Sequence, residues 1–155
     1  MGTAKVDDKG VIAICPECGQ KNRIAYERLG DTGRCGNCKA TLPPPSVPLE
    51  IDQEARFDRI IGSSPIPVIV DYWAPWCGPC RTVAPELEKV ALSGAGRFIV
   101  AKVNTEALPG LAQRHQVRSI PTLGVFMGGR EVARTAGARP ASAIEAFIRE
   151  SVGSR

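Results

Sequence analysis

Residues 70–80 read Val-Asp-Tyr-Trp-Ala-Pro-Trp-Cys-Gly-Pro-Cys, so that two cysteines spaced Cys-x-x-Cys directly follow an apolar run. The run that begins at Val68 is typical of a buried strand, and Pro79 is a favourable residue for the first turn of a helix. This setting places Cys77 at the positive end of the helix dipole and Cys80 one turn inside. Because a helix start lowers the pKa of a thiol, we expect Cys77 to be the more exposed and more reactive of two redox cysteines.

The chain after residue 48 alternates helical and strand patterns. Apolar residues recur at helical spacing around Phe57, and Gly128-Gly129 is a turn signal between two strand patterns, which predicts a hairpin near the end of the chain. The other expected elements are a helix from Pro79, strands over 98–103, 122–127 and 131–135, a short helix over 108–115, and a last helix around 144–152. This order indicates the α/β class, in which several folds share the same pattern.

The front of the chain contains two further Cys-x-x-Cys pairs, separated by sixteen residues. Four cysteine thiolates from two such pairs are typical of one closed, tetrahedral Zn²⁺ site. The predicted metal ligands are Cys15, Cys18, Cys35 and Cys38. The only histidine, His115, is not needed as a ligand, and we expect it to be a solvated residue at the end of a short helix.

A proline-rich segment, Pro43-Pro44-Pro45-Ser46-Val47-Pro48, divides the chain. Such a segment favours extended geometry and forms neither a helix nor a central strand, so it is interpreted as a stiff linker. The predicted organisation is a zinc-binding module over 1–42, a linker over 43–48 and an α/β domain over 49–155. The first module has few large apolar side chains, so burial alone is not expected to stabilise its fold. Structural zinc would stabilise it, since the apparent free energy of zinc binding in small peptides is on the order of 10–16 kcal/mol.

Composition restricts the classes of protein that the chain represents. It has 155 residues, 43% of them hydrophobic, with a net charge of +4 and no run of basic residues. Nucleic-acid binding is therefore not indicated by charge, although basic residues of the zinc module leave it open as an alternative. No signal peptide or membrane span is expected, so that three Cys-x-x-Cys pairs indicate metal and redox use in the cytoplasm rather than structural disulfides.

The segment at residues 70–80 resembles the active-site segment of the thioredoxin family nearly residue for residue, and the resemblance extends over residues 49–155. Later stretches of the chain resemble further landmarks of this family, in the same order and at similar spacing. These stretches are Val100-Ala101-Lys102-Val103-Asn104, Ser119-Ile120-Pro121-Thr122-Leu123, Gly128-Gly129-Arg130-Glu131-Val132 and Gly137-Ala138. The two cysteine pairs at the front are similar to those of the zinc-carrying bacterial thioredoxin 2 subclass.

The resemblance implies a thioredoxin fold, with a mixed central sheet and helices on both faces, behind a small zinc-ribbon-like module. It implies that Cys77 attacks a substrate disulfide, that Cys80 resolves the mixed disulfide, and that Asp71 moves a proton, with Lys102 nearby favouring the charged carboxylate. It further implies a cis-proline loop and a substrate surface around the cysteines. The residues of that surface are Trp76, Gly78, Pro79, Ile120, Pro121 and Gly137.

The implied activity is reduction of protein disulfides. Electrons come from NADPH through a thioredoxin reductase, the partners are disulfide-containing target proteins, and the chain is a monomer. The alternative function is a zinc-dependent redox sensor or binding module that uses the thioredoxin domain as a scaffold. Alternatives to the proposed residue roles also remain. Cys77 and Cys80 could form a structural disulfide or half of a metal site instead of a redox pair. Asp71 and Lys102 could form a purely structural pair instead of taking part in proton transfer.

Overall fold

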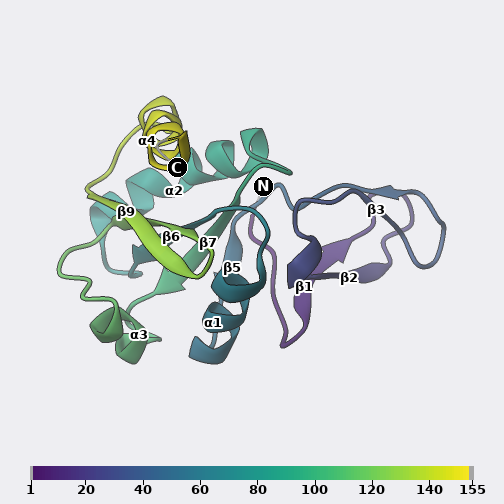
Figure 1. The fold of residues 1–155 in the computed structure, drawn as a ribbon, viewed down its shortest axis with the longest axis horizontal. Coiled ribbons are helices and arrows are strands. Elements are labelled where there is room, and N and C mark those ends of the chain that lie inside the picture. The colour runs from purple at the N-terminus through teal and green to yellow at the C-terminus, as the bar shows by residue number, and fades with distance from the viewer. Residues whose placement is uncertain (1, 154–155) are drawn as a thin grey trace.

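The computed structural model describes residues 2–153, and its centre is a five-stranded mixed sheet of order β5-β7-β6-β8-β9 (Figure 1). Strands β5, β7 and β6 run parallel, whereas β8 and β9 are antiparallel to their neighbours. The strand bounds are Leu49–Ile51 for β5, Val68–Trp73 for β6, Ile99–Asn104 for β7, Thr122–Met127 for β8 and Arg130–Ala136 for β9. The strand β6 lies at the centre of the sheet, since five of its six residues are buried and all of them except Asp71 have largely apolar side chains.

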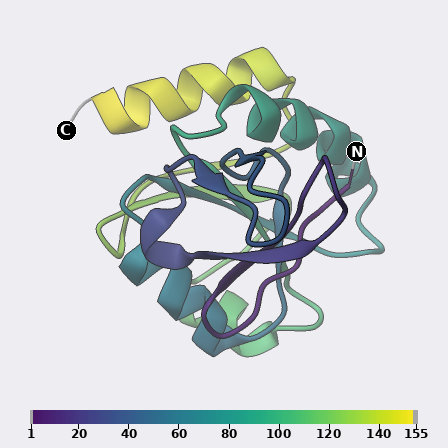
Figure 2. The ribbon, with the colours of Figure 1, turned by 90° about the vertical axis from the view of Figure 1, so that its right-hand side faces the viewer.

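Four helices cover the two faces of this sheet. Their bounds are Glu54–Ser63 for α1, Gly78–Ser93 for α2, Pro109–Arg114 for α3 and Ala141–Gly153 for α4. Helices α1 and α3 contribute buried side chains to one core cluster, and α2 and α4 contribute theirs to the other, so the sheet lies between two apolar layers. The views in Figures 1 and 2 show α2 and α4 together on one side of the molecule. The predicted thioredoxin fold is confirmed.

The N-terminal part consists of two small hairpins and one helical turn. Strand β1 (Gly10–Ile14) pairs with β2 (Lys21–Ala25), and β3 (Gly33–Arg34) pairs with β4 (Thr41–Leu42). A 3-10 helix, η1 (Tyr26–Arg28), links the hairpins. The cysteine pairs occupy the tip of the first hairpin and the matching turn of the second, which brings them together at the end of the lobe that projects to the right in Figure 1. Neither these short strands nor β5 were predicted from the sequence.

Apolar residues of the N-terminal part join the core of the main sheet. The buried side chains of Val6, Val11, Tyr26 and Leu29 belong to the same cluster as those of α1 and β5. The backbone continues this attachment, because the Ala4 amide donates to the Pro48 carbonyl at 2.9 Å and the Glu50 amide donates to the Ala4 carbonyl at 2.9 Å. The first residues therefore extend the sheet beyond β5 by one bridge, between Ala4 and Leu49.

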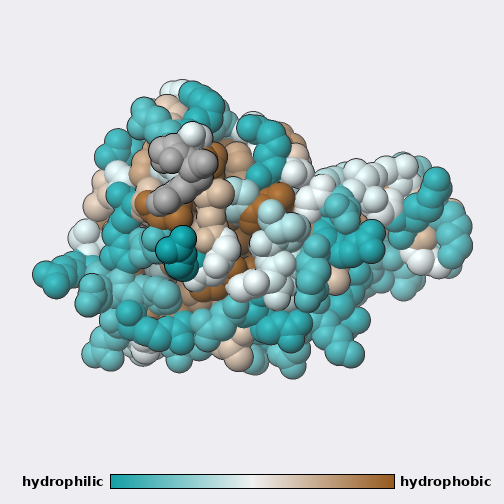
Figure 3. Space-filling model, in the orientation of Figure 1, coloured by the Kyte–Doolittle hydropathy of each residue, from teal (hydrophilic) through white to brown (hydrophobic). Residues whose placement is uncertain are grey.

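The surface outside these contacts is mainly polar. In the view of Figure 3, hydrophilic residues cover most of the face, and apolar surface is visible mainly near its middle. No helix within residues 2–153 is both long and apolar enough to cross a membrane.

Candidate functional site

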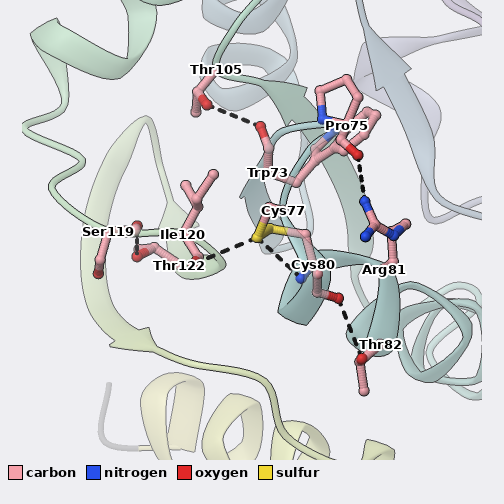
Figure 4. Close-up of a disulfide and its surroundings, with 11 residues drawn as sticks. Trp73, Pro75, Cys77, Cys80, Arg81, Thr82, Thr105, Ser119, Ile120 and Thr122 are labelled. Carbon is pink, nitrogen blue, oxygen red and sulfur yellow. Dashed lines mark hydrogen bonds between the residues drawn. A yellow bond between two sulfur atoms is a disulfide. The ribbon is translucent and has the colours of Figure 1, made fainter.

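The two cysteines of the Cys-Gly-Pro-Cys motif form a disulfide at the start of α2 (Figure 4). Cys77 is the N-cap residue of the helix, and its Sγ accepts the backbone N–H of Cys80 at 3.2 Å. Pro79 fits the first turn because its missing N–H has no acceptor to lose there. Both cysteines are buried in this disulfide form, Cys77 at 4% and Cys80 at 3% exposed, so the expected difference in exposure between them is marginal. Ile120 of the facing loop and Trp73 pack against the cluster that the two cysteines form.

That facing loop carries Ile120 and Pro121. The Ile120–Pro121 peptide bond is cis, as the resemblance implied. The Ile120 carbonyl oxygen lies 3.8 Å from Cys77 Sγ (Figure 4). The Pro121 carbonyl accepts the Gly137 amide at 2.9 Å. Gly137 has φ of 97°, a left-handed conformation that glycine adopts without a steric penalty. Cys77 and Ile120, 43 positions apart in sequence, therefore meet at one end of the sheet, and Gly137 joins them through Pro121.

Trp76 provides a broad apolar surface beside the disulfide. It is 66% exposed, whereas Trp73 and Ala74 pack with the two cysteines and Ile120 in a small cluster. Trp76, Gly78 and Pro79 lie on the same segment, with Gly78 and Pro79 exposed. An exposed aromatic ring beside a reactive group is typical of a surface that contacts another macromolecule.

Asp71 is a buried carboxyl on the central strand, upstream of the cysteines. It is 1% exposed, and its Oδ1 has no hydrogen-bond partner among the described residues. Burial raises the pKa of Asp71 to about 7, and the positive charge of Lys102 opposes this rise. An acid with this pKa is half charged near neutral pH, where a group that accepts and returns protons is most effective.

Lys102 is the register partner of Asp71 on the neighbouring strand β7. Its ammonium group lies 4.8 Å from the centroid of the Trp73 ring, in a cation–π arrangement. Within residues 2–153, Asp71 and Lys102 form no ion pair. Lys102 therefore acts on Asp71 through space rather than by direct contact.

The only histidine lies away from both cysteine sites. The prediction that His115 is solvated is wrong, because its ring packs edge-on against Phe57 and Phe126, with centroids 5.2 and 5.7 Å away. Its Nε2 is buried with no partner in the described chain, and burial lowers the pKa of His115. The short helix α3 ends against the apolar face of the sheet, which explains this burial.

The four N-terminal cysteines converge on one point. Their sulfur atoms all lie within 4.8 Å of one another, and the Cys15–Cys38 and Cys18–Cys35 sulfurs are each 3.6 Å apart. A tetrahedral Zn²⁺ with Zn–S bonds of about 2.3 Å separates its sulfurs by about 3.8 Å. The cluster therefore fits one zinc ion with four thiolate ligands and no open position.

Hydrogen-bond donors surround these sulfurs. The backbone amides of Glu17 and Asn37 approach the sulfurs of Cys15 and Cys35 at 3.4 Å, each from the turn that follows the ligand. The Asn22 side chain donates to Cys35 Sγ at 3.5 Å and accepts the Gly36 amide at 2.9 Å. Donors of this kind stabilise thiolates and orient them toward a metal. Neither Asn22 nor Asn37 was predicted as part of this site, and the only signal for them in the sequence is that both lie close to ligand cysteines.

A redox disulfide at a helix start, opposite a cis-proline loop and preceded by a strand with a buried carboxyl, defines a thiol-disulfide oxidoreductase. Comparison with known proteins agrees. The family model described as Thioredoxin matches residues 48–150, and the one described as Thioredoxin 2, N-terminal, matches residues 14–40. The chain belongs to the thioredoxin family, in the subclass that carries an N-terminal zinc ribbon.

Individual relatives extend this result. Thioredoxin C-3 of Corynebacterium nephridii is 41% identical over 128 residues, which cover 83% of this chain and 86% of that protein. Thioredoxin 1 of Chlorobaculum tepidum is 44% identical over 97 residues, covering 63% of this chain and 96% of that protein. A solved structure of a mutant thioredoxin from Halobacterium salinarum NRC-1 superposes with a TM-score of 0.63 at 29% identity, covering 69% of this chain and 92% of that one.

Proposed function

We propose that this protein is a cytoplasmic, monomeric electron carrier that reduces disulfides in target proteins and receives its electrons from NADPH through a thioredoxin reductase. The observation that carries the proposal is the Cys77–Cys80 disulfide at the N-terminus of α2, beside the Ile120 carbonyl and the exposed Trp76 ring. A flat, partly apolar surface around a redox pair suits extended segments of many sequences.

The proposed reaction takes two exchange steps. In the reduced protein, the Cys77 thiolate attacks one sulfur of the target disulfide, which forms a mixed disulfide and releases the other target sulfur as a thiolate. The Cys80 thiolate then attacks Cys77 Sγ, so that the Cys77–Cys80 disulfide forms and the second target sulfur leaves. Two electrons pass to the target, and the target thiolates take up two protons. The capped helix start supports Cys77 as the attacking residue, because the dipole favours its charged form.

Asp71 is proposed as the group that accepts the Cys80 proton before the second step. Its pKa near 7 supports this role, because a base with that value takes up a proton at neutral pH without being held permanently charged. Lys102 is proposed to adjust the pKa of Asp71 from the adjacent strand. The surface residues proposed to contact the substrate are Trp76, Gly78, Pro79, Ile120, Pro121 and Gly137.

The N-terminal residues 1–42 are proposed to form a module held by a structural zinc ion, joined through residues 43–48 to the thioredoxin domain at 49–155. Cys15, Cys18, Cys35 and Cys38 would hold the ion. When bound, it would supply no chemistry to the exchange and would fix the two hairpins against each other.

The test measures zinc content and NADPH-dependent insulin reduction on one reduced sample, in the presence of a bacterial thioredoxin reductase. We expect one zinc per chain and insulin reduction that is lost in Cys77→Ser. Zinc without any reduction by the wild type would contradict the carrier function.

A redox-sensing role for the zinc site is a second candidate, favoured by the exposure of Cys18 and Cys38. Peroxide oxidises accessible thiolates, and oxidised cysteines release zinc. A sensor would release zinc at peroxide concentrations that oxidise Cys77. Retention of zinc after Cys77 is fully oxidised would exclude this role.

A further inference from the structure

One guanidinium group lies directly beside the redox motif. Arg81 Nη1 donates to the Pro75 carbonyl at 2.7 Å, which fixes the side chain back along the loop that leads to Cys77 (Figure 4). A Cβ built on Gly78 would lie 3.9 Å from Arg81 Nη2. The positive charge is therefore held next to the residue that follows Cys77, on the exposed rim of the site.

This charge has no carboxylate partner in the described part of the chain. Among residues 2–153, Arg81 forms no ion pair, whereas Arg56, Arg114 and Arg134 each pair with a carboxylate. Arg118 likewise has no ion pair in the described residues, and it is exposed two positions before Ile120, whose carbonyl approaches Cys77 Sγ. Arg81 in the first turn of α2 and Arg118 on the loop that carries Ile120 are thus two cationic residues on the segments that form the redox site, and neither has an ion pair among the described residues.

The loops at this edge of the sheet contain little negative charge. Five segments lie at this end of the sheet, namely 52–53, 74–78, 105–108, 115–121 and 137–140, and they contain two carboxylates, Asp52 and Glu106, of which Asp52 pairs with Arg56. Arg118 and Arg139 lie on the same segments, and Arg81 follows in the first turn of α2. Thr105 places the segment of Glu106 beside Trp73, since its amide and hydroxyl donate to the Trp73 carbonyl. The exposed rim of the site is therefore positive overall, because Asp71, on the strand that precedes the cysteines, is buried.

We propose that Arg81, assisted by Arg118, makes this site select target disulfides whose neighbouring residues are aspartate or glutamate. The inference rests on the proposed reduction of protein disulfides and names the class of substrate. A carboxylate next to the attacked cysteine pairs with the Arg81 guanidinium while the target backbone lies along the Ile120 loop. Exposed pairs of this kind act mainly on the rate of encounter and on the choice of partner, and salt weakens them.

The experiment uses the reduced full-length protein and three synthetic peptides, each with one intramolecular disulfide. The peptides are identical except that the residues flanking the attacked cysteine are glutamate, glutamine or lysine. The measured quantity is the second-order rate constant for the appearance of peptide thiols after acid quenching, as each reduced protein molecule delivers its two electrons once. We expect the glutamate peptide to react about fivefold faster than the glutamine peptide, and the lysine peptide to be slowest. About 0.5 M salt should remove most of the difference, because it shortens the screening length to a few ångströms.

Two substitutions assign this preference to Arg81. In the Arg81→Gln variant, the logarithm of the ratio between the glutamate-peptide and glutamine-peptide rates should fall by at least half. The Arg81→Lys variant should keep most of this preference because the charge remains. Arg97→Gln is the matched control. Arg97 is exposed, donates to the Ser93 carbonyl at 2.8 Å, and follows the other end of α2, about 24 Å away for sixteen helical residues. This control should leave the preference unchanged.

Equal wild-type rates for the three peptides would overturn the inference and leave the proposed function standing. A preference that survives in an Arg81→Gln, Arg118→Gln double variant would also overturn it. If the wild type reduces none of the peptides and no insulin, the proposed function itself fails, and the inference fails with it.

Discussion

Asp71 and Lys102 face each other across the β6–β7 ladder, yet the Lys102 ammonium group lies over the Trp73 ring instead of pairing with the carboxylate. The Asp71 carboxylate is consequently buried with only distant compensation for its charge. Burial raises the pKa of Asp71 to about 7 for this reason. The same arrangement that suits proton transfer must therefore lower the stability of the fold at neutral and alkaline pH.

We predict that Asp71→Asn stabilises the protein at high pH. An aspartate that titrates at 3.8 when unfolded and near 7 when folded favours folding below pH 3.8, and this contribution is lost as the pH rises through 7. The variant should gain about 2–4 kcal/mol in the free energy of unfolding at pH 8 and little at pH 4. Urea titrations at both pH values measure this difference, and an equal gain at both would contradict the buried-charge explanation.

The same substitution should slow disulfide exchange. Without a proton acceptor for Cys80, Asp71→Asn should reduce insulin at least about tenfold more slowly at pH 7, with a smaller deficit at higher pH, where the thiol ionises unaided. Single-turnover rates over pH 6–9 measure the deficit. Wild-type rates across that range would remove Asp71 from the mechanism.

Lys102→Met tests the action of the lysine through space. Removing the positive charge should raise the pKa of Asp71 further, because Lys102 opposes the effect of burial. The pH–rate profile should shift to higher pH, with slower exchange at pH 7 and near-normal exchange above pH 8. Lys89→Met is a suitable control, since Lys89 is an exposed residue of α2 that pairs with Glu86, and it is not among the groups that shift the pKa of Asp71. An unchanged profile for Lys102→Met would show that the lysine is structural only.

Leu29→Ala tests whether the N-terminal part is integral to the main core. Leu29 is fully buried in the cluster that includes α1 and β5, so the substitution should cost about 2–5 kcal/mol in the free energy of unfolding. Ile14→Ala is the matched control, because Ile14 is 55% exposed on the same lobe and its loss should cost about 0.5 kcal/mol or less. Similar costs for the two variants would contradict the shared core.

Removal of zinc should affect the whole protein. We expect chelation to lower the midpoint of the thermal unfolding transition in a single step, since Val6, Val11 and Tyr26 link the zinc lobe to the core of the main sheet. Addition of zinc should restore the original midpoint. Calorimetry that shows two independent transitions, with the main one unchanged, would mean that the lobes do not support each other.

We predict that His115 makes the stability of the fold sensitive to acid. Burial lowers its pKa in the folded state, with Arg114 acting in the same direction and Glu131 and Asp58 opposing. The unfolded chain therefore binds the proton more readily, and stability falls as the pH drops through the ordinary range of histidine. Between pH 7.5 and 5, the free energy of unfolding measured with urea should fall less for the His115→Phe variant than for the wild type. A parallel loss in both proteins would assign the acid sensitivity to other groups.

The redox motif and the zinc ligands could be predicted from sequence because their chemistry depends on local spacing. Two cysteines at a helix start and four cysteines in two Cys-x-x-Cys pairs each indicate a specific use of thiols. The order of helices and strands could also be predicted. The apolar residues of a mostly apolar strand such as β6, or of a helix with one apolar face, recur at short, regular spacing along the chain.

Contacts between distant segments were decided by the tertiary structure. Three contacts depend on which segments become neighbours in the fold. Cys77 is buried beside the Ile120 loop, the Lys102 ammonium group lies over the Trp73 ring, and His115 packs against Phe57 and Phe126. The sharing of one core by the zinc lobe and the main sheet has the same origin. The sequence by itself determined the reactive groups and the class of fold, because these follow from residue type and spacing. Burial and electrostatic environment required the folded chain, because they are set by side chains that lie far apart along it.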